Sequence, residues 1–144
     1  MVPSEAQSPV MLVVEDNAGD VALLKEALAA SHTAAVMRVV TDGGDAMRFL
    51  RREAAFSDSP RPDVVVLDLN LPGKSGYEVL REMASDPELN TISVAILTSS
   101  AHETCLCETY PQGRCQYFTK TADFKRLQDI VRKITEHPRT APFA

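Results

Sequence analysis

The chain has 144 residues, the size of one domain with a full hydrophobic core. A formal net charge of −5 and the absence of any Lys/Arg run longer than Arg51-Arg52 argue against binding of nucleic acid or a membrane surface through charge. No apolar run approaches the roughly 18 residues that span a bilayer, and the N-terminal residues lack the pattern of a signal peptide, so we expect no membrane contact and a cytoplasmic location.

Strand and helix patterns alternate in the first half of the chain. Residues 10–14 form a continuous apolar run, which is typical of a strand buried on both faces. Val21, Leu24 and Leu28 then recur at the spacing of an amphipathic helix. Arg38 favours an edge position for the second strand. The predicted elements are a strand at 10–14, a helix at 18–31, a strand at 35–40 and a helix around residues 46–50.

The same alternation continues in the second half. Residues 64–67 are four apolar residues, three of them β-branched, which predict a second strand buried on both faces. Ser75 is a candidate N-cap for the next helix, which Asp86-Pro87 ends. The predicted elements are strands at 64–67, 94–97 and 116–119, a helix after Ser75, a weaker helix at 102–110, and a last helix at about 123–136 that ends at His137-Pro138.

Five strand-then-helix units in strict alternation predict an α/β fold with a doubly wound, five-stranded parallel sheet. The two most apolar strands, 10–14 and 64–67, are expected at its centre. This favours the strand order 2-1-3-4-5 of flavodoxin-like folds. We expect residues 1–9 to form a flexible leader, residues 10–137 to form the domain and residues 138–144 to form a C-terminal tail.

The three cysteines do not have the spacing of a metal site. Cys105 and Cys107 would stand about 200° apart on a helix, so they cannot share a ligand face with His102. We therefore expect Cys105, Cys107 and Cys115 to be buried or half-buried reduced thiols.

Polar side chains stand where four of the predicted strands end. Glu15 and Asp16 follow the first strand, Asp68 the third, Thr98 the fourth and Lys120 the fifth. Because these strands are neighbours in the expected order, the five residues converge on one rim of the sheet. Each has an ordinary structural explanation when taken alone, such as an acidic pair at a helix start or a surface lysine. Their joint placement indicates a site.

Three carboxylates within a few ångströms of one another cannot all stay ionised without a counter-charge. A cluster of oxygen ligands selects a hard divalent cation, so we expect Mg²⁺ held by the three carboxylates and the backbone carbonyl of Asn70, with Mn²⁺ able to substitute. Lys120 offers a positive charge and Thr98 a hydroxyl to an incoming anion. This set suits transfer of a phosphoryl group to the Asp68 carboxylate.

These residues carry a resemblance to the response-regulator receiver domains of two-component signalling, over about residues 10–137. The similar blocks, in order, are residues 13–17, 67–73, 97–99 and 117–120. Glu15-Asp16-Asn17, the long loop at 56–63 and the run Asp86-Pro87-Glu88-Leu89 further resemble stand-alone regulators that pair with phytochrome kinases.

The resemblance implies a receiver fold in which Asp68 accepts phosphate from a sensor histidine kinase, here of the phytochrome type. It implies that Lys120 contacts the acyl phosphate and that Thr98 and Tyr117 move as the switch. Such a protein is a phosphoacceptor that catalyses its own phosphorylation and dephosphorylation, rather than an enzyme. The resemblance also suggests a homodimer through the face of segments 102–110, 116–119 and 123–136, which Tyr117, Phe118 and Phe143 could support.

One position departs from the family pattern. The family usually follows its lysine with a proline in a cis bond, whereas Thr121 follows Lys120 here. A cis bond before a residue other than proline costs about 3–4 kcal/mol, so we expect a trans link or a rare strained cis one. The family's frequent acidic residue near the start of the third helix is replaced by Ser75.

Three other functions stay open at this point. A binding module that is no longer phosphorylated is modestly favoured by Thr121 but opposed by the intact aspartates and lysine. A Mg²⁺-dependent phosphohydrolase with an aspartyl-phosphate intermediate would carry a second aspartate where Asn70 stands. A flavodoxin is weaker still, because the loop after the first strand lacks a phosphate cradle. A catalytic histidine is not expected, because His32, His102 and His137 all fall outside the cluster.

Overall fold

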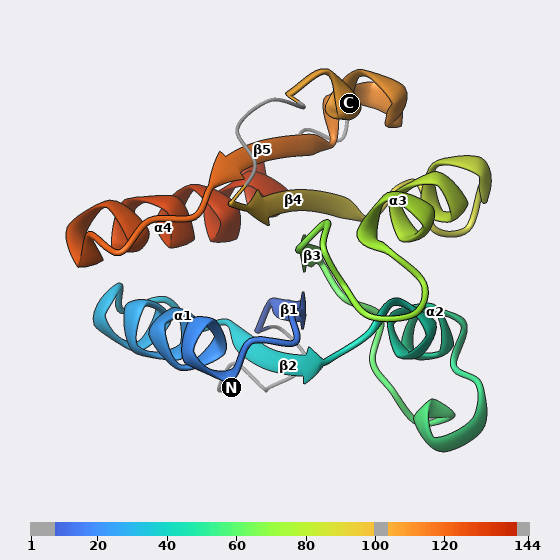
Figure 1. Ribbon diagram of the computed structural model, residues 1–144, viewed down its shortest axis with the longest axis horizontal. Coiled ribbons are helices and arrows are strands. Elements are labelled where there is room, and N and C mark those ends of the chain that lie inside the picture. Colours follow the sequence, from blue (N-terminus) through green and yellow to red (C-terminus); the bar gives the residue numbers. More distant parts are fainter. Residues whose placement is uncertain (1–7, 100–103, 141–144) are drawn as a thin grey trace, which may run out of the picture.

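The computed structural model describes residues 8–99 and 104–140, which form a parallel five-stranded sheet with helices on both faces (Figure 1). The strand order is β2-β1-β3-β4-β5, which confirms the predicted topology and the edge position of Arg38 in β2. The strands are β1 (Val10–Val14), β2 (Val36–Val40), β3 (Val64–Leu67), β4 (Ser93–Thr98) and β5 (Cys115–Thr119). The α-helices are α1 (Ala18–Ala30), α2 (Gly43–Arg51), α3 (Gly76–Ser85) and α4 (Phe124–Thr140), and the 3₁₀ helices are η2 (Ala54–Phe56), η3 (Thr104–Thr109) and η4 (Pro111–Gly113).

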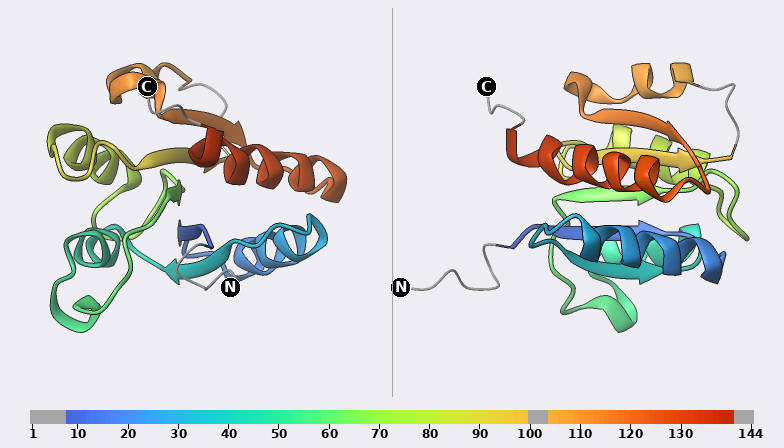
Figure 2. Two further views of the ribbon diagram at one scale, coloured as in Figure 1. Left: turned by 180° about the vertical axis from the view of Figure 1, so that it is seen from behind. Right: turned by 90° about the vertical axis from the view of Figure 1, so that its left-hand side faces the viewer.

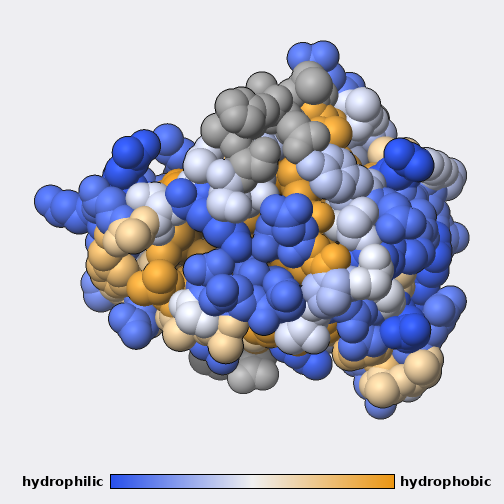
Figure 3. Space-filling view, viewed as in Figure 1, coloured by the Kyte–Doolittle hydropathy of each residue, from blue (hydrophilic) through white to orange (hydrophobic). Residues whose placement is uncertain are grey.

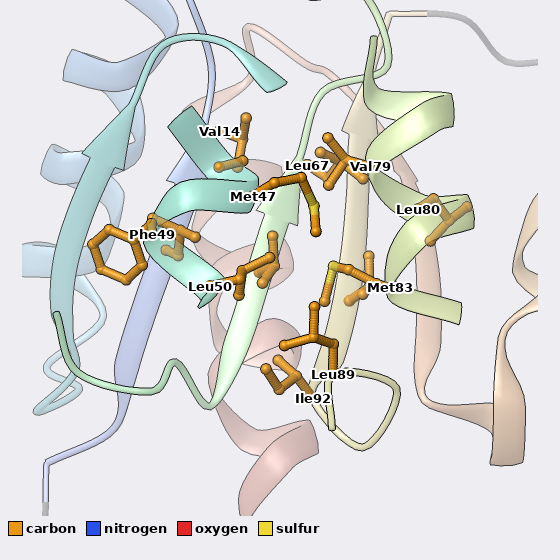
Figure 4. Packing of buried hydrophobic residues seen from close by; sticks show 14 of the residues in the cluster. Val14, Met47, Phe49, Leu50, Leu67, Val79, Leu80, Met83, Leu89 and Ile92 are labelled. Atoms are coloured by element: carbon orange, nitrogen blue, oxygen red, sulfur yellow. The ribbon is translucent and has the colours of Figure 1, made fainter. Parts of the chain in front are cut away.

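The sheet is buried on both sides, which explains its continuous apolar strands. Leu12 and Val14 of β1 point into a core beneath α2 and α3, whereas Met11 and Val13 point into a second core beneath α1 and α4. A strand that is covered on both faces needs apolar residues at every position. Figure 4 shows the first core, to which α2 and α3 contribute the side chains of Met47, Phe49, Leu50, Val79, Leu80 and Met83.

Side-chain caps fix where the helices begin. The Asn17 side chain accepts a hydrogen bond from the first turn of α1, and the Asp42 side chain does the same for α2. Ser75 and Glu78 form a reciprocal capping box at the start of α3, which confirms Ser75 as the predicted N-cap. No helix within residues 8–99 and 104–140 is long and apolar enough to cross a membrane.

The connection between β4 and β5 differs from the prediction. An α-helix was expected at 102–110. Residues 100–103 lie outside the described part of the chain, and residues 104–109 form the 3₁₀ helix η3 instead. Threonine and cysteine, which make up two thirds of η3, are weak α-helix formers. The buried side chain of Tyr110 anchors the end of this segment, because its hydroxyl donates to the carbonyl oxygen of Ile92 at 2.6 Å.

The prediction of reduced thiols is wrong for two cysteines, because Cys107 and Cys115 form a disulfide. The chain turns back after η3, so this 3₁₀ helix lies along β5 (Figure 1). The two Cα atoms are 5.1 Å apart, within the range that a disulfide spans. The spacing of cysteines along one helix gives no sign of this bond, because it joins two neighbouring elements.

The last helix is longer than predicted. It continues through His137-Pro138 to Thr140, although a proline was expected to end it. A proline in the final turn removes only one backbone hydrogen bond, so the turn around it keeps its helical form. The described residues contain no cis peptide bond, so the Lys120–Thr121 link is trans. This is one of the two forms expected where threonine replaces the family's usual proline.

The start of α2 offers a test of the packing between α2 and the loop that follows β3. A Cβ on Gly43 would collide with the backbone carbonyl of Lys74, whereas a Cβ on Gly44 would meet only side-chain atoms, the nearest at 3.3 Å. Gly43→Ala should therefore lower the free energy of unfolding by about 2 kcal/mol or more. Gly44→Ala should change it by no more than about 1 kcal/mol. Urea denaturation followed by circular dichroism measures both, and equal losses would contradict the packing described.

Candidate functional site

The predicted site residues lie together at the carboxyl ends of the strands. The strand arrows in the right-hand view of Figure 2 all point the same way, toward the side that faces the viewer in Figure 1. Ladder hydrogen bonds extend into the residues that follow the strands: the Asp68 amide donates to the Val14 carbonyl at 3.1 Å, and the Lys120 amide donates to the Thr98 carbonyl at 2.8 Å. The backbone of the sheet therefore fixes these positions.

Three carboxylates form a compact cluster on this rim. Glu15, Asp16 and Asp68 each offer one oxygen, and the three oxygens lie within 4.8 Å of one another. Glu15 and Asp68 are buried, whereas Asp16 is exposed. Backbone amides orient the two buried groups: Asn17 donates to Glu15 Oε2 at 3.0 Å, and Asn70 donates to Asp68 Oδ1 at 3.2 Å. Buried carboxylates held so close together need a cation nearby.

Lys120 supplies that positive charge. Its Nζ lies 2.9 Å from Glu15 Oε1, 3.0 Å from Asp68 Oδ2 and 2.8 Å from Asp20 Oδ2. Burial by itself would lower the pKa of Lys120, but the hydrogen bonds to three carboxylates outweigh burial and raise that pKa above its usual value. Burial raises the pKa of Glu15, and the contact with Lys120 offsets only part of this rise.

Asp20 was not among the residues predicted for the site. It falls within the helix predicted at 18–31, and the apolar spacing of that helix gives Asp20 no separate role. It lies in the first turn of α1, directly after β1 ends, so its carboxylate reaches the same rim as Asp16. The position of Asp20 in the sequence could have pointed to the site. When a helix follows a strand directly, the residues of its first turn lie beside the carboxyl end of that strand.

The remaining predicted residues surround this cluster. Thr98 is fully buried, and its Oγ1 has no hydrogen-bond partner among the residues that the structure describes. Tyr117 is half-buried in β5, opposite Ile96, and packs against the core beneath α2 and α3. Asn70 is exposed, and a metal contact through its backbone carbonyl stays a prediction. Figure 3, viewed as Figure 1, shows hydrophilic side chains over the middle of this face.

The donor set fits a hard divalent cation. All three groups of the cluster are carboxylates, and oxygen ligands of this kind suit Mg²⁺ and Mn²⁺. The cluster found in the described part of the chain contains no cysteine or histidine. A donor set without these ligands is poorly suited to zinc.

The raised pKa of Glu15 leads to a prediction about stability in the absence of metal. The folded state binds a proton on Glu15 more readily than the unfolded chain, so the ionised carboxylate destabilises the fold at neutral pH. Glu15→Gln should therefore raise the free energy of unfolding at neutral pH in the presence of a chelator. As the pH falls, Glu15 becomes neutral in the wild type and this advantage should shrink.

Urea denaturation of the wild type and Glu15→Gln at several pH values measures this difference. An advantage that grows toward acid pH would contradict the assigned direction of the shift.

Comparisons with known proteins agree with this geometry. The family model of the response regulator receiver domain matches residues 11–132. Response regulator Rcp1 of Synechocystis sp. is 38% identical over 125 residues, which cover 87% of this chain and 85% of Rcp1. The crystal structure of the phosphorylated cyanobacterial phytochrome response regulator RcpA matches with a TM-score of 0.80 and 40% identity, over 94% of this chain and 96% of RcpA.

A crystal structure of the Mn²⁺-bound form of Rcp1 matches with a TM-score of 0.77 and 38% identity, over 88% of this chain and 91% of that one. The family match spans the sheet and nearly all of the helices around it. The relatives add that phytochrome response regulators are among the proteins most similar to this one. This chain belongs to the response regulator receiver domain family.

Proposed function

We propose that this protein is a signalling switch in which Asp68 accepts a phosphoryl group from a sensor histidine kinase in a Mg²⁺-dependent reaction. One observation supports this most: the Asp68 carboxylate contacts Lys120 at 3.0 Å while sharing a cluster with two further carboxylates. A phosphoryl acceptor needs positioning and neutralisation of charge rather than acid–base groups, and these neighbours supply both. The protein would act as a phosphoacceptor that promotes its own phosphorylation and dephosphorylation.

Each site residue has a distinct role in this proposal. Glu15, Asp16, Asp68 and the backbone carbonyl of Asn70 would hold Mg²⁺, for which Mn²⁺ could substitute. The bound cation would neutralise charge on the phosphoryl oxygens. An Asp68 oxygen attacks phosphorus as the bond from phosphorus to the kinase's histidine nitrogen breaks. Lys120 then moves its ammonium group from the carboxylates to a phosphoryl oxygen.

Thr98 and Tyr117 would convert the chemistry into a change of shape. The hydroxyl of Thr98 is buried and lacks a partner among the described residues, so a phosphoryl oxygen on Asp68 would give it one. Movement of Thr98 would let the half-buried ring of Tyr117 turn inward from β5. A phosphoryl group brings up to about two negative charges and three acceptor oxygens, which is enough to bias such a two-state element.

The partner in this proposal is a phytochrome-type kinase in the cytoplasm. Its support is the similarity to RcpA and Rcp1, since RcpA is described as a phytochrome response regulator. The changed surface would be the face of η3, β5 and α4, where β5 is an edge strand of the sheet. At this edge η3 lies along β5 and is joined to it by the Cys107–Cys115 disulfide, so a second copy would dock onto the face rather than extend the sheet.

Acetyl phosphate tests the acceptor directly. Intact mass spectrometry should show a gain of one phosphoryl group in the presence of Mg²⁺ and no gain in the presence of a chelator. Asp68→Asn should abolish the gain because it removes the nucleophile, and Asp16→Asn should reduce it strongly because it removes a metal ligand. Asp63→Asn, at the opposite end of β3, serves as the control and should behave as the wild type. A gain that persists in Asp68→Asn would contradict the assignment.

Self-association is tested separately by size-exclusion chromatography with light scattering. Beryllium fluoride with Mg²⁺ mimics a phosphorylated aspartate and should shift the wild type toward a dimer. The shift should be absent in Asp68→Asn. An unchanged mass for the wild type, with beryllium fluoride bound as judged by calorimetry, would rule out dimerisation as the output and leave binding to another protein.

A further inference from the structure

We infer that Asp20 is a positioning residue, which keeps the Lys120 ammonium group at the site when a divalent cation occupies the carboxylate cluster. This inference rests on the proposed function, because it concerns the same cluster. It assigns a task to a residue that stands outside the proposed set of metal ligands and does not touch the phosphoryl acceptor in any contact that the structure gives.

The contact between Asp20 and Lys120 is a direct one. The distance from Asp20 Oδ2 to Lys120 Nζ is 2.8 Å, as short as the contacts that the ammonium makes with the two buried carboxylates. The side chain of Asp20 is 35% exposed and that of Lys120 is 22% exposed, so this pair lies at the mouth of the site. The residues stand 100 positions apart in the chain, which means that the fold brings them together.

The partners of Lys120 divide into two kinds. Glu15 and Asp68 belong to the three-carboxylate cluster whose oxygens lie within 4.8 Å of one another, whereas Asp20 does not. A divalent cation in the cluster would repel the ammonium group and compete with it for the oxygens of Glu15 and Asp68. Lys120 contacts three carboxylates in the structure. With a cation in the cluster, only the contact with Asp20 would remain without competition.

The surroundings offer the ammonium group little else. A pocket beside Lys120, between α1 and α4, has Glu15 and Asp20 as its acidic lining residues. The rest of its lining is Thr121 and the apolar side chains of Leu23, Leu24, Leu97 and Leu127. An ammonium displaced from the cluster therefore keeps a charged partner in Asp20 or moves out into water. Held by Asp20, it stays beside Asp68, where an incoming phosphoryl oxygen would meet it.

Asp20 itself is fixed by the start of α1. The Asn17 side chain caps this helix by accepting a hydrogen bond from the Asp20 amide at 3.0 Å. Asp45 of α2 offers a matched position, since its amide is capped in the same way by Asp42 at 2.7 Å. Asp45 contacts Arg48 on the surface and has no contact with the cluster in the structure. Asp45→Asn therefore reproduces the loss of a first-turn carboxylate without disturbing Lys120.

Isothermal titration with Mn²⁺ tests the inference through a double-mutant cycle. Asp20→Asn should weaken Mn²⁺ binding by about three- to tenfold, the effect of losing one charge-assisted hydrogen bond to Lys120. Lys120→Met should tighten Mn²⁺ binding, because it removes the competing ammonium group. In the Lys120→Met background, Asp20→Asn should change the affinity by less than about twofold, which is the remaining effect of a screened charge. Asp45→Asn should bind Mn²⁺ as the wild type does.

Asp20→Glu keeps the charge and should restore most of the affinity. If Lys120→Met fails to fold, Lys120→Gln takes its place in the cycle. An equal loss from Asp20→Asn in both backgrounds would show a simple charge effect and overturn the inference, as would no loss in either. If the wild type binds Mn²⁺ but gains no phosphoryl group from acetyl phosphate, the proposed function fails while the role of Asp20 is still decided by the titrations. No Mn²⁺ binding by the wild type would overturn both.

Discussion

The ion contacts of the Lys120 ammonium group are the interaction on which the site depends. Parallel strands that end at one rim bring the carboxylates of Glu15 and Asp68 together in a buried place, where their mutual repulsion and loss of hydration oppose folding. Lys120 arrives from β5 and contacts both at about 3 Å. The single positive charge of Lys120 therefore faces a cluster of three carboxylates, which in the proposed function would leave room for a metal ion and then for an anion.

The packing around the rim leaves the backbone little freedom to adjust. Gly76 opens α3 directly against Asp68, the proposed acceptor, since a Cβ on Gly76 would collide with the Asp68 backbone carbonyl. The Gly76 amide also donates to the Leu69 carbonyl at 3.1 Å. In the proposed switch, the Lys120 ammonium group and the Thr98 hydroxyl would therefore move by side-chain rotation while the strand ends stay in place. This arrangement suits a switch whose input is a small charged group.

Much of this could be predicted from the sequence because β1 and β3 are continuous apolar runs, and such strands belong at the centre of the sheet. Strand ends then placed Asp68 and Lys120 on one rim. The place of Asp20 in the site was missed because the apolar spacing of a helix shows only which residues are polar. It does not show which side chain of the first turn lies beside the end of a strand. The Cys107–Cys115 disulfide and η3 were missed because they depend on how one irregular connection folds along β5, where short-range propensity is weak.

In the proposed mechanism, the metal ion and the phosphoryl group together draw Lys120 away from Glu15 while Asp20 retains it. A crystal structure with Mg²⁺ and beryllium trifluoride on Asp68 tests this most directly. We expect Mg²⁺ bound to Glu15, Asp16 and Asp68, with the ammonium group of Lys120 contacting a fluorine atom and Asp20. A structure in which Lys120 still contacts Glu15, or in which Mg²⁺ lies outside the three-carboxylate cluster, would contradict it.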